Sequence, residues 1–268
     1  MKKNVPFVIT IAGSDPSGGA GIEADIKTLT SLKVYALDVI TTQTIQNTKG
    51  VYEKIFLSPE IIKKQLEKIF EDFKVDVVKL GMPGNKEIIN VILPFIAGKT
   101  IIFDPVIYSK NGFPLTDESE VDYIKEKILP ISTIITPNYF ELKSFSGLET
   151  ESPAKMAKKL LLDFKGISAI VVKGGHIDEE KETIIDILVL REKEDFKVFK
   201  FRHKRIRTKN LHGTGCTLSS AIAAYIAREN SVELSVKKGI KYLTKIIKKS
   251  ASYAIGMGNG PLIHFLGK

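Results

Sequence analysis

The sequence predicts a single α/β domain of 268 residues, with a mostly parallel central sheet and helices on both faces. Short β-branched runs alternate along the chain with amphipathic stretches of helical period, an order typical of β–α–β units. The apolar runs are continuous, as in strands that helices cover on both faces. No Pro-, Gly- or Ser-rich linker divides the chain, so residues 1–268 are expected to form one domain.

The strands and helices are expected in a regular order. The strands predicted for the parallel sheet are Val8–Ala12, Ala36–Thr41, Val75–Leu80, Thr100–Asp104, Thr133–Thr136 and Ala169–Lys173. An antiparallel hairpin is predicted where two apolar runs flank a charged turn, Ile184–Leu190 and Lys197–Phe201. The predicted helices are Ile22–Leu32, Pro59–Phe73, Thr214–Arg228 and Val232–Ile255. Ser58 is the expected N-cap of the second helix, with Pro59 in its first turn.

The composition, 43% hydrophobic and 26% charged, suffices for one large core and argues against global disorder. The net charge of +9 would suit a nucleic-acid partner, but the basic residues are scattered and no nucleic-acid-binding motif is present. The densest basic stretch, Lys200–Lys209, is expected to be a solvated strand edge, with attraction of a polyphosphate substrate as the alternative.

Cellular location is indicated by the cysteine content and the N-terminus. Cys216 is the only cysteine, which rules out an internal disulfide and fits a reducing compartment such as the cytoplasm. The apolar run Val5–Ala12 faintly resembles a signal peptide, yet it contains Pro6 and lacks a plausible cleavage site, so we interpret it as the first strand. No apolar stretch approaches the roughly 20 residues that a membrane span needs.

Polar or glycine-rich segments recur where the predicted strands end. In parallel sheets, ligands bind outside these carboxyl ends. The segments are Gly13-Ser14-Asp15, Gly81-Met82, Asp104-Pro105, Thr136-Pro137-Asn138 and Lys173-Gly174-Gly175.

The first glycine-rich segment, Gly13–Gly21, joins a strand to a helix, and its backbone N–H groups could approach an anion or a polar ligand. It is not a Walker A loop, because no Gly-Lys-Ser/Thr closes it. Gly19–Ala24 matches the Gly-x-Gly-x-x-Ala dinucleotide pattern, so a nicotinamide-dependent oxidoreductase is a rival hypothesis. A tight turn without a ligand is the structural alternative.

The second glycine-rich segment, Asn210–Ser219, opens directly into an apolar helix. The N–H groups at this helix N-terminus, together with the helix dipole, could form an anion hole that stabilises a phosphoryl group in transfer. They belong to Gly213, Thr214, Gly215 and Cys216. Close helix packing is the alternative role of the glycines. Cys216 is expected to have a lowered thiol pKa at this position and could polarise or deprotonate a hydroxyl, unless it is only a small buried hydrophobic residue.

Asn138 and Glu141 lie three residues apart at the start of a predicted helix and so share a face. An amide and a carboxylate suit Mg²⁺ that keeps several waters, and N-capping of the helix is the alternative, compatible role. Lys173 could reach nucleotide phosphates, or it could simply extend to solvent at a strand end. The histidines show no metal-ligand spacing, so we assign no metal held directly by protein side chains. Gly256–Pro261 is interpreted as a C-cap and turn.

Taken together, these motifs resemble the ribokinase superfamily and, within it, the hydroxymethylpyrimidine/phosphomethylpyrimidine kinases of thiamin biosynthesis. The resemblance runs nearly end to end and is carried by Thr10–Ile22, Gln46–Thr48, Lys79–Met82, Ile135–Asn138, Val172–His176, Asn210–Ser219 and Gly260–Pro261. It implies a ribokinase-like fold, ATP and Mg²⁺ as cofactors, and phosphorylation of a hydroxymethyl-aminopyrimidine and then of its monophosphate. A homodimer is also implied, because relatives often dimerise.

The resemblance also implies residue roles. Superfamily members usually carry Gly-Ala-Gly-Asp with the aspartate as base, and Cys216 stands at that place, nearest the substrate hydroxyl. Gln46 matches the position that recognises the aminopyrimidine edge, where an amide offers a donor beside an acceptor. Some relatives carry glutamate there, so Gln46 alone does not decide the substrate. The pyrimidine and its arm would be lined by Gly13, Ala20, Asp25, Met82 and Val106, and ATP·Mg²⁺ by Asp104, Asn138, Glu141 and Lys173.

Other functions stay open on the sequence. Pyridoxal or pyridoxine kinase, or a dual activity, is the nearest alternative, because that substrate also carries a hydroxymethyl group on a nitrogen heterocycle. The oxidoreductase and a basic nucleic-acid-binding protein are the alternatives from other classes.

Overall fold

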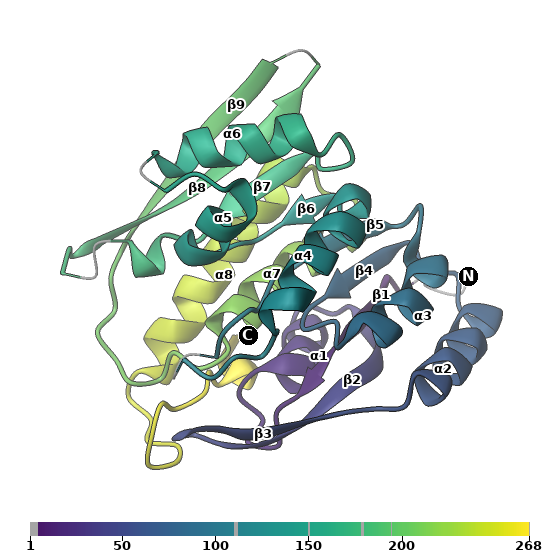
Figure 1. The fold of residues 1–268 in the computed structure, drawn as a ribbon. Coiled ribbons are helices and arrows are strands. Elements are labelled where there is room, and N and C mark those ends of the chain that lie inside the picture. Colours follow the sequence, from purple (N-terminus) through teal and green to yellow (C-terminus); the bar gives the residue numbers. More distant parts are fainter. Residues whose placement is uncertain (1–4, 110–111, 150, 178–179, 194, 268) are drawn as a thin grey trace, which may run out of the picture.

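The computed structural model describes residues 5–109, 112–149, 151–177, 180–193 and 195–267. Within them, nine strands form one sheet in the order β3-β2-β1-β4-β5-β6-β7-β8-β9 (Figure 1). The strand bounds are β1 Phe7–Ser14, β2 Tyr35–Asn47, β3 Gly50–Phe56, β4 Val77–Leu80, β5 Thr100–Phe103, β6 Ile134–Ile135, β7 Ala169–Val172, β8 Thr183–Glu192 and β9 Asp195–Lys204.

The predicted parallel sheet is confirmed, and so is the hairpin. Strands β2, β1, β4, β5, β6 and β7 pair in parallel, while β8 and β9 add an antiparallel hairpin to β7. A second antiparallel pair, β2 with β3, was not predicted. Strand β2 continues to Asn47, six residues beyond the predicted end at Thr41, because its distal half pairs with β3 at the sheet edge instead of entering the buried layer.

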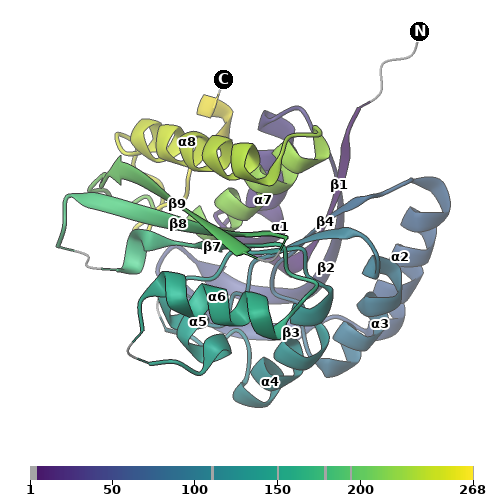
Figure 2. The same ribbon diagram turned by 90° about the horizontal axis from the view of Figure 1, so that it is seen from above.

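Helices cover both faces of the sheet, as the continuous apolar runs predicted (Figure 2). On one face lie α2 Pro59–Asp72, α3 Lys86–Ile96, α4 Glu118–Lys127, α5 Tyr139–Ser146 and α6 Pro153–Asp163. On the other lie α1 Gly21–Ser31, α7 Thr214–Ala227 and α8 Val232–Ser250. Successive strand residues enter opposite cores: Ile101 and Phe103 pack with the first group of helices, and Ile102 packs with the second.

Several predicted boundaries were wrong. Helix α8 ends at Ser250 and not at Ile255, because residues 251–254 are exposed and lack an apolar face to bury. Gly256–Pro261 therefore does not cap that helix; Gly258 donates its N–H to the hydroxyl of Thr48 at 3.1 Å, beside the β2–β3 turn.

Ser58 precedes α2 but makes no side-chain capping bond. Helices α3, α4 and α6 were not predicted. In the described residues, no helix is long and apolar enough to cross a membrane.

Candidate active site at the carboxyl ends of the parallel strands

The two glycine-rich segments meet at the carboxyl end of β1. Gly213, which precedes α7, has a φ of 80°, and a β-carbon on it would lie 1.8 Å from the carbonyl oxygen of Gly19. Only glycine satisfies both conditions, since the left-handed backbone and the missing β-carbon are needed together. The segment after β1 and the segment before α7 are therefore in direct backbone contact.

Asp15 organises the first segment from within. Its carboxylate accepts N–H bonds from Ser17 at 2.9 Å, Gly19 at 3.0 Å and Ala20 at 2.9 Å, and Nε2 of His212 lies 2.7 Å from its Oδ2. Burial opposes ionisation of Asp15, but the hydrogen bonds from His212 and Ser17 outweigh it and lower its pKa from 3.8 to about 2. Asp15 is therefore an anion at neutral pH, and Nε2 of His212 is the donor to it.

Gln46, near the end of β2, contacts the same imidazole. Its Nε2 position lies 3.0 Å from Nε2 of His212, and its Oε1 position lies 3.1 Å from the hydroxyl of Thr44. The Nε2 proton of His212 is directed to Asp15, and the Thr44 hydroxyl donates to the carbonyl of Ser14 at 2.9 Å. With its amide oxygen toward His212 and its nitrogen toward Thr44, Gln46 shares the Nε2 proton of His212 with Asp15 and donates to the Thr44 hydroxyl.

The start of α7 offers backbone donors. The first bond within this helix runs from the N–H of Thr217 to the carbonyl of Gly213, so the N–H groups of Thr214, Gly215 and Cys216 have no partner within it. A β-carbon on Gly215 would lie 3.5 Å from both Asp104 Oδ2 and Lys173 Nζ. This helix N-terminus thus faces the charged residues at the ends of β5 and β7.

The expectation of a low pKa for Cys216 is wrong. Burial is the largest influence and raises the thiol pKa to about 12, against the opposing effect of Lys79. Cys216 is a buried free thiol, 9% exposed. The helix N-terminus would favour a thiolate, but loss of water around the sulfur costs more. At neutral pH, Cys216 is therefore a protonated thiol.

Asp104, Lys173 and Glu141 form a buried charged cluster. Nζ of Lys173 lies 2.8 Å from Oδ1 of Asp104 and 3.7 Å from Oε2 of Glu141. Asp104 also accepts from the hydroxyls of Thr136 at 3.0 Å and Ser219 at 3.2 Å. Burial opposes the Asp104 charge, but Lys173 holds its pKa below the ordinary value; burial raises the pKa of Glu141 to about 7.

The expected capping role of Asn138 and Glu141 is confirmed. The Asn138 side chain accepts from the N–H groups of Phe140 and Glu141, and the Glu141 carboxylate accepts from the N–H of Asn138 at 2.7 Å. Lys173 donates its N–H to the carbonyl of Pro137 at 3.0 Å, which ties the end of β7 to the start of α5. The capping box thus also fixes the Glu141 carboxylate beside Lys173.

Asp25 lies below the site, not at its surface. It is fully buried and accepts from Thr10 at 2.6 Å, Lys79 at 2.8 Å and Ser220 at 2.7 Å, which links α1 to β1, β4 and α7. Lys79 is fully buried as well, so the two charges form an internal ion pair. In this structure the contacts of Asp25 are internal, and a direct contact with substrate stays a prediction.

The remaining predicted site residues lie at neighbouring strand ends. A β-carbon on Gly13 would lie 3.1 Å from the Met82 sulfur, so Gly13, near the end of β1, packs against Met82, which follows β4. Ala20 is the N-cap of α1. Val106 follows β5, and its carbonyl accepts from the Thr116 hydroxyl at 3.1 Å.

Close packing explains Gly19, the first glycine of the Gly-x-Gly-x-x-Ala pattern that suggested a dinucleotide site. A β-carbon on Gly19 would lie 2.2 Å from the His212 ring and 3.1 Å from Pro261. Glycine is therefore required at this position by protein packing, without a pyrophosphate.

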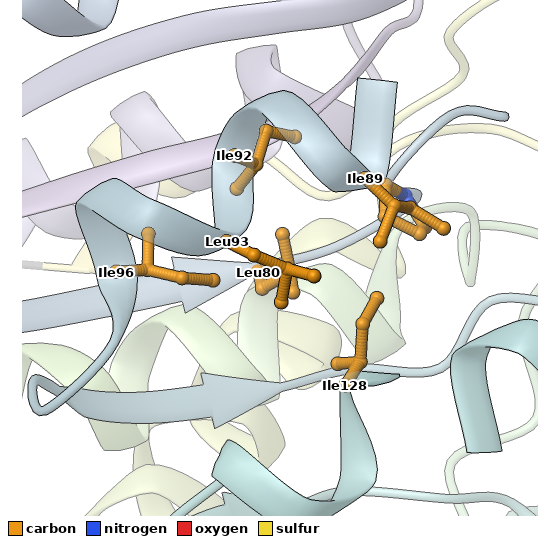
Figure 3. Close-up of a pocket in the computed structure, with 7 residues that line it drawn as sticks. Leu80, Ile89, Ile92, Leu93, Ile96 and Ile128 are labelled. Carbon is orange, nitrogen blue, oxygen red and sulfur yellow. The ribbon is translucent and has the colours of Figure 1, made fainter. Parts of the chain in front are cut away.

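A crevice beside α3 lies apart from this site. Figure 3 shows its apolar lining; the lining residues are Leu80, Pro83, Ile89, Ile92, Leu93, Ile96 and Ile128. It has no room for a water molecule, so it is part of the packed core. Among the described residues, no group of three or more His, Cys, Asp and Glu side chains is arranged to hold a metal ion.

Sequence reasoning missed the roles of Asp15 and His212, although both lie inside motifs that it identified. It also missed the hydroxyl groups of Ser219 and Ser220, which bind Asp104 and Asp25 one turn into α7. A carboxylate in a glycine-rich turn was the available signal for Asp15. The partners of these residues lie far away in the chain, and no local pattern identifies them.

Comparison with known proteins finds a matching kinase family and similar kinases. The family model of phosphomethylpyrimidine kinase matches residues 15–263. The chain is 36% identical over 263 residues to the hydroxymethylpyrimidine/phosphomethylpyrimidine kinase of Escherichia coli, covering 96% of each. It is 39% identical over 273 residues to the chloroplastic thiamine biosynthetic bifunctional enzyme of Arabidopsis thaliana, covering 99% of this chain but about half, 51%, of that protein.

A solved structure is also similar. The ADP complex of Bacillus subtilis pyridoxal kinase superimposes with a TM-score of 0.82 at 30% identity, covering 97% of this chain and 98% of that one. The mostly parallel sheet is therefore that of ribokinase-like kinases.

Proposed function

Because the chain belongs to the phosphomethylpyrimidine kinase family, we propose that it phosphorylates 4-amino-5-hydroxymethyl-2-methylpyrimidine with ATP, and then phosphorylates the monophosphate to the diphosphate, in thiamin biosynthesis. One observation carries this proposal. The N–H groups at the start of α7, which have no partner within the helix, lie between the segment that holds Gln46 and the cluster of Asp104, Lys173 and Glu141. A donor set placed between two ligand sites suits transfer of an anionic group from one to the other.

The anion hole is proposed to act on the transferred phosphoryl group. The N–H groups of Gly213, Thr214, Gly215 and Cys216 would stabilise the negative charge that spreads over its oxygens. Because the Cys216 thiol keeps its own proton at neutral pH, it would orient the substrate hydroxyl and would not act as the base that deprotonates it. The transition state of phosphoryl transfer is loose, so orientation contributes more than basicity.

Gln46 is proposed to recognise the aminopyrimidine. With its oxygen toward His212 and its nitrogen toward Thr44, one amide N–H and one oxygen lone pair remain for a ligand. This donor beside an acceptor matches a ring nitrogen next to an exocyclic amino group. Around the ring and its arm we propose Gly13, Ala20, Asp25, Met82 and Val106.

ATP is proposed to bind beside Lys173, with Asn138 at the same strand end. Mg²⁺ fits this place, because two carboxylates, Asp104 and Glu141, already converge on one cation, the Lys173 ammonium. Hard oxygen donors of this kind are the ones that Mg²⁺ takes together with phosphates. When bound there, the ion would neutralise phosphate charge.

Pyridoxal kinase activity is a second candidate, favoured by the likeness to the Bacillus subtilis enzyme. The deciding experiment is ADP release by the purified protein with hydroxymethylpyrimidine, its monophosphate and pyridoxal side by side. Turnover of both pyrimidines with little on pyridoxal is expected. Turnover of pyridoxal alone would overturn the role of Gln46, and turnover of none would overturn the kinase proposal.

The cytoplasm is proposed as the location, supported by the single cysteine, which rules out an internal disulfide. A homodimer is proposed as the assembled state, supported by exposed apolar residues on the β2–β3 hairpin, Ile45, Tyr52 and Ile55. Light scattering on the purified protein would test it, and a monomeric mass would contradict it.

A further inference from the structure

The nearly buried carboxylate of Asp186, on β8, is used by none of the steps above. Its Oδ1 accepts the backbone N–H of Gly174 at 2.8 Å, and its Oδ2 lies 2.9 Å from Nε2 of His203 on β9. Gly174 directly follows Lys173 in the turn after β7. The Asp186 carboxylate thus binds the residue that directly follows Lys173, the lysine of the charged cluster.

The hairpin register brings these groups together. Ile184 pairs with His203 and Asp186 pairs with Phe201, so Asp186 and His203 are diagonal neighbours on one face of the hairpin. Arg205, two residues after His203, reaches the same turn, since its guanidinium donates to the carbonyl of Gly175 at 3.1 Å. Lys204, between them, is exposed. Alternate residues of the basic stretch therefore support the turn after β7.

The turn is held closely against the hairpin. A β-carbon on Gly174 would lie 2.1 Å from the carbonyl oxygen of Ile185, so the backbones of the turn and of β8 touch. On its other side, Lys173 donates its N–H to Pro137 at 3.0 Å. The two peptides that flank Lys173 are therefore both held, the one before it by Pro137 and the one after it by Asp186. A carboxylate is a stronger acceptor for the Gly174 N–H than a neutral group.

We propose that Asp186, oriented by His203, is a positioning residue that holds the turn after β7 so that Lys173 and the Gly174–Gly175 backbone meet the nucleotide phosphates. The hairpin itself pairs along its length without this contact. Through the turn, the carboxylate affects nucleotide affinity; in the part of the chain that the structure describes, its hydrogen bonds go to Gly174 and His203, which are not among the residues proposed to bind the pyrimidine. This inference rests on the proposed place of ATP beside Lys173.

The test is calorimetric titration with ADP and Mg²⁺, together with KM for ATP and for hydroxymethylpyrimidine. Asp186→Ala is expected to weaken ADP binding and raise KM for ATP about tenfold, the usual effect of losing a charged hydrogen bond, and to leave KM for the pyrimidine within about twofold. His203→Gln is expected to have about a threefold effect in the same direction, because Gly174 keeps its acceptor. The double variant should match Asp186→Ala, since His203 acts only through Asp186.

The matched control is Arg207→Gln, which breaks an ion pair with Glu182 beside the same hairpin, where both side chains are more than 60% exposed. It should leave all these constants unchanged. Unchanged ADP affinity in Asp186→Ala, or an equal rise in both KM values, would overturn the inference. If Asp186→Ala does not fold, His203→Gln decides in the same way. The ADP titration needs no second substrate, so it tests this inference independently of the reaction. Failure of the wild type to phosphorylate any alcohol would overturn the proposed function instead.

Discussion

Nε2 of His212 donates to Oδ2 of Asp15 at 2.7 Å, and the two residues are 197 positions apart in the chain. This contact joins the segment after β1 to the segment before α7. Since Gln46 contacts the same imidazole, one histidine connects the anion hole, the first glycine-rich segment and the residue proposed to recognise the pyrimidine.

His212→Ala is expected to raise KM for hydroxymethylpyrimidine at least about tenfold, because it removes the imidazole donor to the Asp15 carboxylate and frees the Gln46 amide to rotate. Steady-state kinetics on His212→Ala, Gln46→Ala and the double variant would measure this. The losses should not add, because the histidine orients the glutamine. Fully additive losses would show that the two residues act independently.

Cys216→Ala is expected to lose most turnover but to retain pyrimidine binding, because the thiol orients the hydroxyl while Gln46 holds the ring. Calorimetry and ADP release on the same preparation would separate the two effects. Wild-type turnover in the variant would remove the cysteine from the mechanism.

The thiol of Cys216 is expected to react slowly with iodoacetamide at pH 8. A pKa of about 12 leaves roughly one molecule in ten thousand as thiolate at that pH. The chain has a single cysteine, so mass spectrometry reports on this thiol alone. Urea-unfolded protein is the control and should react far faster; equal rates would contradict the raised pKa.

Gly213→Ala is expected to destabilise the fold by more than about 2 kcal/mol and to abolish activity, because the new methyl would meet the Gly19 carbonyl. Gly147→Ala is the matched control: Gly147 has a φ of 65° and open space around its β-carbon position. It should cost about 1 kcal/mol with normal kinetics. Denaturant unfolding and ADP release would measure both, and equal costs would refute the clash.

Glu141 is expected to make wild-type stability fall as pH rises from about 4.5 to about 7. Its pKa is raised on folding to about 7, so in this window the folded chain holds the proton that the unfolded chain has lost. Glu141→Gln keeps an acceptor for the Asn138 N–H and removes this dependence. The stability of the variant relative to wild type should therefore rise by about 2–3 kcal/mol across the window. Denaturant unfolding at pH 5, 6, 7 and 8 would measure it; a constant difference would refute it.

Much of the fold could be predicted because its causes are local. Runs such as Ala169–Val172 are apolar at every position because both faces of these strands are covered, and that pattern is legible without any partner. The capping box of Asn138 and Glu141 was predictable for the same reason, since both residues lie within one helical turn. Strand β3 was missed because it is short and mixed in polarity, and only its partner β2 makes it a strand.

By itself, the sequence determined the parallel sheet, the two glycine-rich segments, the strand-end residues and the family. Only the tertiary structure decided that Cys216 keeps its proton, that Asp25 lies below the site, and that His212 and Asp186 position the residues around them. These properties depend on loss of water and on contacts between residues far apart in the chain. Local periodicity carries no information on either, because burial and long-range pairing arise only when the separate elements pack together.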